Sequence, residues 1–122
     1  MIRRRDVLLL AAAGLAASAA TAALPPAERA RIDRLIHYVE TRKDVRFIRN
    51  GHDYSSDEAA GFLRKKLDKM GEHVNSARDF IEQIASKSST SGEAYNIRYA
   101  NGRTEPAAKF LGDELHRMDA GK

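Results

Sequence analysis

The chain has no cysteine among its 122 residues. It therefore forms no disulfide bond and carries no cysteine-linked lipid anchor. Motifs of several enzyme classes are also missing: there is no HExxH or close pair of histidine and carboxylate, and no GxSxG around a serine. Stability must come from packing alone, and no local motif identifies a catalytic centre.

Metal-binding patterns are equally scarce. The four histidines, His37, His52, His73 and His116, lie far apart in the sequence, so we predict no metal site and no cofactor. The alternating Asp53-x-Ser55-x-Asp57 resembles the start of a calcium loop, but the sixth position is Glu58 instead of glycine and the twelfth is Arg64 instead of an acid. Helix capping explains these residues better.

Only one long apolar run is present, from Val7 to Ala23, and it follows the basic start Arg3-Arg4-Arg5. This order, ending in the small residues Ala20-Thr21-Ala22, predicts an export signal cleaved after Ala22. We therefore expect residues 1–22 to be removed and residues 23–122 to form one small periplasmic domain without a stable membrane anchor. An uncleaved anchor is the alternative, and the Arg4-Arg5 pair leaves a Sec or a twin-arginine route open.

The charge balance argues against nucleic acid as a partner. Residues 1–22 hold three arginines and one aspartate, so their removal lowers the formal net charge from +4 to +2. A nucleic-acid-binding protein is expected to concentrate basic residues on one face, whereas here both signs are interspersed.

The apolar spacing predicts an α+β fold in the order α-β-α-α-β-α. Apolar residues at intervals of three and four indicate four helices: over 27–41, after Ser55, after Asn75-Ser76, and from Thr104 onward. The second of these starts with a capping box of Ser55 and Glu58, and its apolar stripe reaches Met70 and Val74. Short strands are expected at 45–49, ended by Asn50-Gly51, and at 95–99, ended by Asn101-Gly102. We expect about four helices packed with a two-stranded, most simply antiparallel, β-ribbon.

One resemblance covers nearly the whole of the predicted domain. It rests on Phe47-Ile48-Arg49-Asn50-Gly51, Tyr54, Glu58-Ala59-Ala60, Leu63-Arg64-Lys65-Lys66-Leu67, Ala77, Phe80-Ile81, Ser88-Ser89, Ser91-Gly92 and Tyr95. In these residues the chain resembles the YfeK-like family of small bacterial periplasmic proteins of unknown function. The family often has a histidine before the Leu-Arg pair, where this chain has Phe62. The resemblance implies a compact periplasmic domain and supplies no substrate or catalytic residue.

Two segments are candidates for binding, since each joins a strand to a helix and combines flexible backbone with hydrogen-bond donors and an aromatic ring. The candidate residues are Arg49, Asn50, Gly51, His52, Asp53, Tyr54, Ser89, Ser91, Gly92 and Tyr95. Antiparallel strands would bring the two segments to one end, where the start of the second helix could complete an anion-friendly pocket.

We therefore favour a binding or interaction module for a protein or cell-envelope ligand. The alternatives are a small hydrolase built from His52, Asp53 and a serine of the later loop, an accessory protein without a ligand, or segments that serve only as turns and caps.

Overall fold

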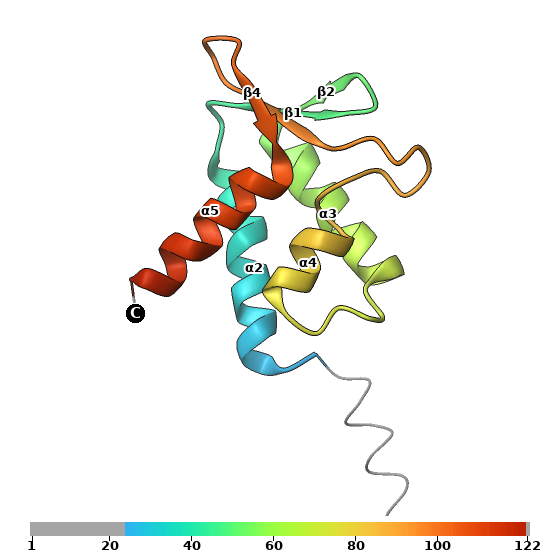
Figure 1. Cartoon of the computed structure of the whole chain (residues 1–122), viewed down its shortest axis with the longest axis vertical. Helices are drawn as coiled ribbons and strands as arrows, with labels where there is room; N and C mark the ends of the chain where they lie inside the picture. The colour runs from blue at the N-terminus through green and yellow to red at the C-terminus, as the bar shows by residue number, and fades with distance from the viewer. Residues whose placement is uncertain (1–23, 122) are drawn as a thin grey trace, which may run out of the picture.

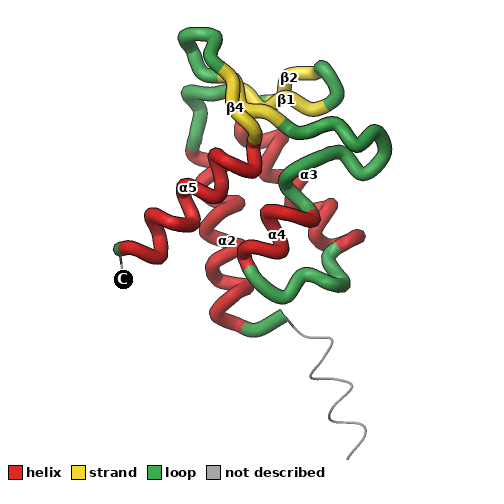
Figure 2. The backbone as a smooth tube through the Cα atoms, viewed as in Figure 1, coloured by secondary structure: helices red, strands yellow, loops and turns green. Residues whose placement is uncertain are grey.

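A computed structural model describes residues 24–121, and the predicted signal segment 1–22 lies outside them. The described chain holds four helices, α2 (Pro26–Thr41), α3 (Ser56–Met70), α4 (Ala77–Gln83) and α5 (Ala107–Ala120). Its strands are β1 (Arg46–Arg49), β2 (His52–Tyr54), β3 (Asn96–Arg98) and β4 (Thr104–Pro106). The sheet crosses one end of the helices, which pack beneath it (Figures 1 and 2). The α+β class is thus confirmed.

The sheet has four strands where two were predicted. All neighbours are antiparallel in the order β2-β1-β3-β4, and the two predicted strands, β1 and β3, pair directly with each other. The missed strands β2 and β4 form the edges. Each is only three residues long and runs almost directly into a helix, so neither shows an alternating apolar pattern. Residues 104–106, predicted to begin the last helix, form β4 instead, and Pro106 precedes the first turn of α5.

The capping signals were correct. The Ser55 hydroxyl accepts the amide of Glu58 at 3.2 Å, and the Glu58 carboxylate accepts the amide of Ser55 at 2.9 Å, which completes the predicted capping box of α3. Ser76 caps α4 in the same way through the amide of Asp79. Both caps satisfy amides that helix geometry leaves without an internal partner.

The end of α3 was predicted less well. Gly71 caps the end of the helix, and a β-carbon there would lie 2.4 Å from the carbonyl oxygen of Leu67, so the position requires glycine. Met70, the last helical residue, is 50% exposed instead of buried, and Val74 is buried but lies beyond the end of the helix.

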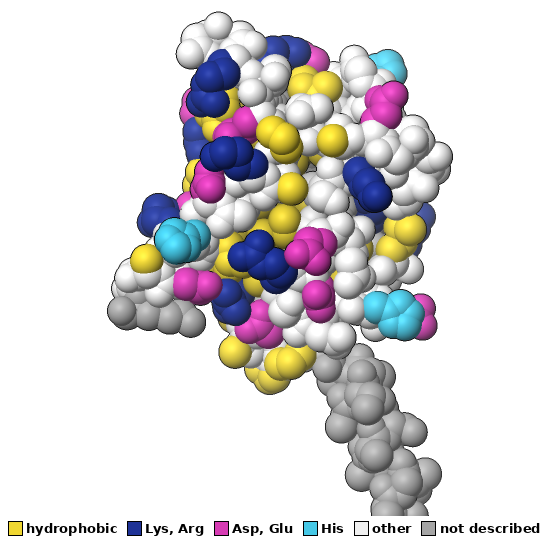
Figure 3. All heavy atoms as spheres, viewed as in Figure 1, with side chains coloured by type: hydrophobic (Ala, Val, Ile, Leu, Met, Phe, Trp, Pro, Cys, Tyr) yellow, Lys and Arg dark blue, Asp and Glu magenta, His cyan; other side chains and the backbone are white. Residues whose placement is uncertain are grey.

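One hydrophobic core fills the space between the sheet and the helices. Its fully buried members include Ile32, Leu35 and Ile36 of α2, Phe80 of α4 and Ile97 of β3. Over the face seen in Figure 3, basic and acidic side chains alternate instead of gathering by sign. None of the helices within residues 24–121 is both long and apolar enough to cross a membrane.

Candidate functional site

The structure brings the two predicted segments together through Asn50. Its amide oxygen accepts the hydroxyl of Ser91 at 2.6 Å, and its amide nitrogen lies 3.4 Å from the hydroxyl of Ser88. Asn50 has φ 51° and Gly51 has φ 80°, so the turn between β1 and β2 uses the left-handed backbone that these residues tolerate. This turn presents the Asn50 side chain to the later loop.

Most polar groups of the later loop are used within the fold. Ser88 is buried, and its hydroxyl accepts the amides of Thr90 and Ser91, each at 3.3 Å. Ser89 is exposed and donates to the sulfur of Met70, while Gly92 supplies a positive φ of 77°. The loop surface is therefore largely committed to holding its own shape.

His52 and Asp53 do not join the serines. The register pairs Phe47 with Tyr54 on the inner face, so the next residue, Asp53, lies on the outer face of the sheet. There it pairs with Arg98 and lies 3.9 Å from Arg46. The hydrogen bond from Arg98 lowers the pKa of the Asp53 carboxyl. Within residues 24–121, His52 forms no hydrogen bond with Asp53 or with a serine, so the residues suggested for a hydrolase do not form a nucleophile–base pair.

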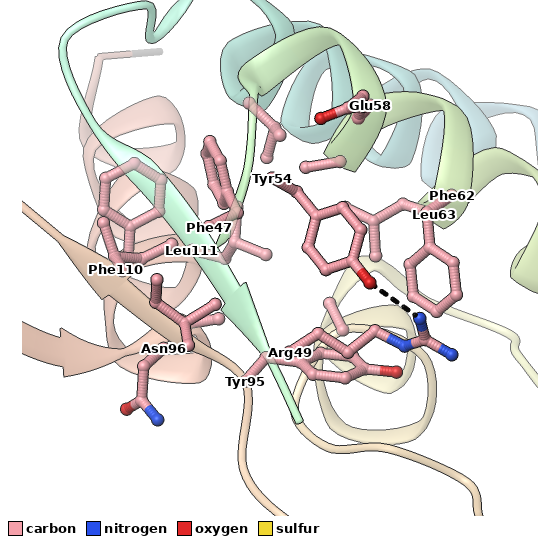
Figure 4. Close-up of a pocket in the computed structure, with 16 residues that line it drawn as sticks. Phe47, Arg49, Tyr54, Glu58, Phe62, Leu63, Tyr95, Asn96, Phe110 and Leu111 are labelled. Carbon is pink, nitrogen blue, oxygen red and sulfur yellow. Dashed lines mark hydrogen bonds between the residues drawn. The ribbon is translucent and has the colours of Figure 1, made fainter. Parts of the chain in front are cut away.

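A cavity of about 180 Å³ lies on the inner side of the sheet. Its walls come from β1, β2 and β3 and from α2, α3 and α5 (Figure 4). Most of the lining side chains are apolar, including Phe47, Leu63, Phe110 and Leu111. The Phe47 ring meets the Phe110 ring edge-on at 6.1 Å between centroids. The apolar end of the cavity is therefore built from side chains that also join the sheet to α5.

The other end of the cavity is polar and contains three predicted site residues, Arg49, Tyr54 and Tyr95. The Arg49 guanidinium lies 4.5 Å from the centroid of the Phe62 ring and 3.4 Å from the Tyr54 hydroxyl. In Figure 4, these groups face one another at the end opposite Phe47. The Nε atom of Arg49 is buried and has no hydrogen-bond partner in the described structure.

A second cation, the ammonium group of Lys66, lies next to the polar end of the cavity, beside Tyr95 and Phe62. Lys66 is only 6% exposed, and its ammonium group donates to the Tyr95 hydroxyl at 2.9 Å and to the carbonyl oxygen of Lys87 at 2.8 Å. It lies 4.9 Å from the Tyr95 centroid and 6.0 Å from the Phe62 centroid. The Phe62 ring is thus close to both Arg49 and Lys66.

Phe62, Lys66 and Phe110 line or adjoin the cavity but were not predicted as site residues, because they lie within helices and the predicted sites were loops. A signal for Lys66 was available: position 66 follows Leu63 by three and Ala59 by seven residues, so it falls on the apolar stripe of α3. A lysine on a buried face needs polar partners there.

Within the described residues, no group of three histidine, aspartate or glutamate side chains is placed to hold a metal ion.

Comparison with known proteins gives the family. The model of the family of unknown function DUF5329 matches residues 26–119, so the chain belongs to that family. The chain is also 37% identical over 68 residues to the uncharacterized protein YfeK of Salmonella typhimurium, a match that covers 56% of this chain and 57% of YfeK. The resemblance to a YfeK-like family is therefore confirmed. No solved structure matches the chain significantly.

Proposed function

We propose that this domain is a binding protein that holds a small, mainly apolar ligand in the cavity between its sheet and its helices. The observation that carries the proposal is the cavity itself. Its volume of about 180 Å³ is close to that of an engineered apolar cavity of about 150 Å³ that stays dry and takes up benzene. A ligand the size of one ring with a short substituent fits such a space.

The position of the cavity supports binding over catalysis. The polar side chains in its lining are Arg49, Tyr54, Tyr95, Asn96 and Glu58, and the Glu58 carboxylate is held in the capping box of α3. Small-molecule sites commonly combine apolar walls with a few polar groups that orient the ligand. A hydrolase built from His52 and Asp53 has no support in this geometry, because Asp53 pairs with Arg98 on the outer face of the sheet.

Export belongs to the same proposal. The basic start, the apolar run from Val7 and the Ala20-Thr21-Ala22 triplet have the pattern of a secretory signal. We place the working domain in the periplasm, where it would meet small molecules that have entered the cell envelope.

The cavity can be tested with a pair of neighbouring alanines on α5. Ala107 lines the cavity and is 6% exposed, whereas Ala108 is partly buried and does not line it. We expect Ala107→Leu to fill the cavity and abolish binding of benzyl alcohol, while Ala108→Leu leaves that binding unchanged. A side chain that fills empty space adds apolar contacts, so Ala107→Leu should be at least as stable as the unaltered protein.

The measurement is a titration with benzyl alcohol followed by backbone amide shifts in nuclear magnetic resonance (NMR) spectra. Shifts should concentrate at Phe47, Leu63 and Leu111, and should disappear in Ala107→Leu. Shifts scattered over the surface, or equal in both variants, would contradict the proposal.

A further inference from the structure

We infer that the ligand of this cavity is a small organic acid: a compact apolar body, about one ring in size, carrying one carboxylate that pairs with Arg49. This inference rests on the proposed function and adds the chemical class of the ligand. It follows from the charges at the polar end of the cavity and from the partners that those charges lack.

Arg49 has no acidic partner. No carboxylate of residues 24–121 lies within 4 Å of its guanidinium, although most other arginines near the sheet have one: Arg46 and Arg98 share Asp53, and Arg42 pairs with Asp44. The contacts of Arg49 are the face of Phe62 and one long hydrogen bond to Tyr54, and its Nε–H has no acceptor within the part of the chain that the structure describes. Leaving a buried donor of a charged group without an acceptor is costly, so a ligand that supplies one would be stabilised there.

The nearby carboxylate is committed elsewhere. Glu58 lines the cavity, but its Oε1 atom accepts the amide of Ser55 in the capping box at the start of α3. In Figure 4 it points away from Arg49. A glutamate in the first turn is held there by the hydrogen bond and by the helix dipole, and Glu58 forms no ion pair with Arg49.

Lys66 strengthens the preference for an anion. Its buried ammonium also has no carboxylate within 4 Å among residues 24–121, since its partners are a carbonyl oxygen and the Tyr95 hydroxyl. Two positive charges therefore lie close to the Phe62 ring, at 4.5 and 6.0 Å from its centroid, and neither forms an ion pair among residues 24–121. Their combined potential at this end of the cavity favours an anion, and partial burial makes the attraction stronger than it would be in water.

The geometry of arginine and the size of the cavity select the kind of anion. The planar fork of a guanidinium matches the two oxygens of a carboxylate, and Arg49 has an Nε–H to offer beside its terminal nitrogens. A volume of about 180 Å³ has room for one ring but not for a long acyl chain. Benzoate meets both conditions, and benzyl alcohol is its uncharged match in size.

The experiment compares benzoate with benzyl alcohol by isothermal titration calorimetry on the unaltered domain, on Arg49→Gln and on Arg103→Gln. Arg103 is the matched control because its guanidinium also stacks on an aromatic ring, that of Tyr99 at 4.2 Å, but it does not line the cavity. We expect the unaltered domain to bind benzoate at least tenfold more tightly than benzyl alcohol, as a hydrogen bond to a charged group implies. Arg49→Gln should lose this preference and keep its affinity for benzyl alcohol, and Arg103→Gln should retain both.

Tyr54→Phe is a second variant that does not depend on the folding of Arg49→Gln. It removes one hydroxyl from the polar end, and we expect it to weaken benzoate severalfold without affecting benzyl alcohol. Equal affinity of the unaltered domain for the two probes would overturn the inference and leave the binding function standing. Binding of neither probe would overturn both.

Discussion

Two adjacent residues, Arg49 and Asn50, have different roles: Arg49 lines the cavity, whereas Asn50 links the two loops. Arg49 is the last residue of β1 and turns its side chain inward, over Phe62. Asn50 starts the turn and reaches outward to Ser91. Because the backbone at Asn50 has φ 51°, the link between the two loops depends on a conformation that few side chains accept.

The contributions of the Asn50 backbone and side chain can be separated. Asn50→Gly keeps the left-handed backbone and removes the hydrogen bonds to Ser91 and Ser88, so we expect a loss of about 1 kcal/mol in the free energy of unfolding. Asn50→Ala removes the same bonds but keeps a β-carbon in the left-handed region, without the polar side chain that lets asparagine tolerate it, so we expect it to cost about 1 kcal/mol more than Asn50→Gly. Urea denaturation of the two variants measures both quantities.

Ser91→Ala provides the check on the side-chain part. It removes the same 2.6 Å hydrogen bond by deleting the donor, the Ser91 hydroxyl, instead of the acceptor on Asn50. The loss in the free energy of unfolding should therefore not add to that of Asn50→Gly when the two changes are combined. Full additivity would show that the loops are held together by something other than this link.

Single residues also show how far the sequence could predict the site. Arg49, Tyr54 and Tyr95 were found because they flank turn residues, and they do line one cavity. Phe62 and Lys66 were not found, because an aromatic and a lysine within a helical stripe have ordinary structural explanations. Only the packing of α3 against the sheet places both beside Arg49.

Among the elements, helices were easier to predict than edge strands. Helix α3 is indicated by its capping box and α2 by the prolines at its start, and both show apolar spacing over 15 or 16 residues. A strand of three residues such as β2 has one side chain on one face and two on the other, which is too short for a pattern. Its pairing is fixed by the Asn50-Gly51 turn and by contacts such as that of Asp53 with Arg98.

The pairing of Asp53 with Arg98 joins β2 to β3 across β1, and it should depend on pH. Arg98 lowers the folded-state pKa of Asp53, so the stabilisation is complete above the pKa of an unfolded aspartate, about 3.9, and is lost as the pH falls through the folded-state pKa. We expect Asp53→Asn to lower the melting temperature slightly at pH 7, and the difference from the unaltered protein to shrink below about pH 4. The effect should be small because both side chains are partly exposed.

Asp68→Asn is the control, since Asp68 is exposed on α3 and has no ion pair within residues 24–121. Thermal unfolding of both variants at pH 7 and pH 3 gives the comparison. An Asp53→Asn difference that is as large at pH 3 as at pH 7 would mean that Asp53 acts through packing and not through its charge.

For the whole molecule, the sheet, helices α2 to α5 and the cavity are all built from residues 24–121. Leu24 packs against the hydrophobic core, and α2 begins at Pro26. Removal of residues 1–22 would therefore take away none of the side chains that build the sheet, the helices or the cavity. This is what a cleaved export signal requires, because the domain must fold without it.

The cut after Ala22 can be tested with a pair of neighbouring alanines at the junction. Signal peptidase needs a small residue immediately before the cut, so Ala22→Tyr should block processing, whereas Ala23→Tyr, on the other side of the bond, should allow it. We expect the full chain, expressed in a bacterium that has both export routes, to appear in the periplasm with the intact mass of residues 23–122.

The export route is tested by the arginine pair. Replacing Arg4 and Arg5 by lysine should abolish export by a twin-arginine route and leave a Sec route working. A membrane-bound product with the mass of all 122 residues would instead establish the uncleaved anchor, and the cavity would then act at the membrane surface.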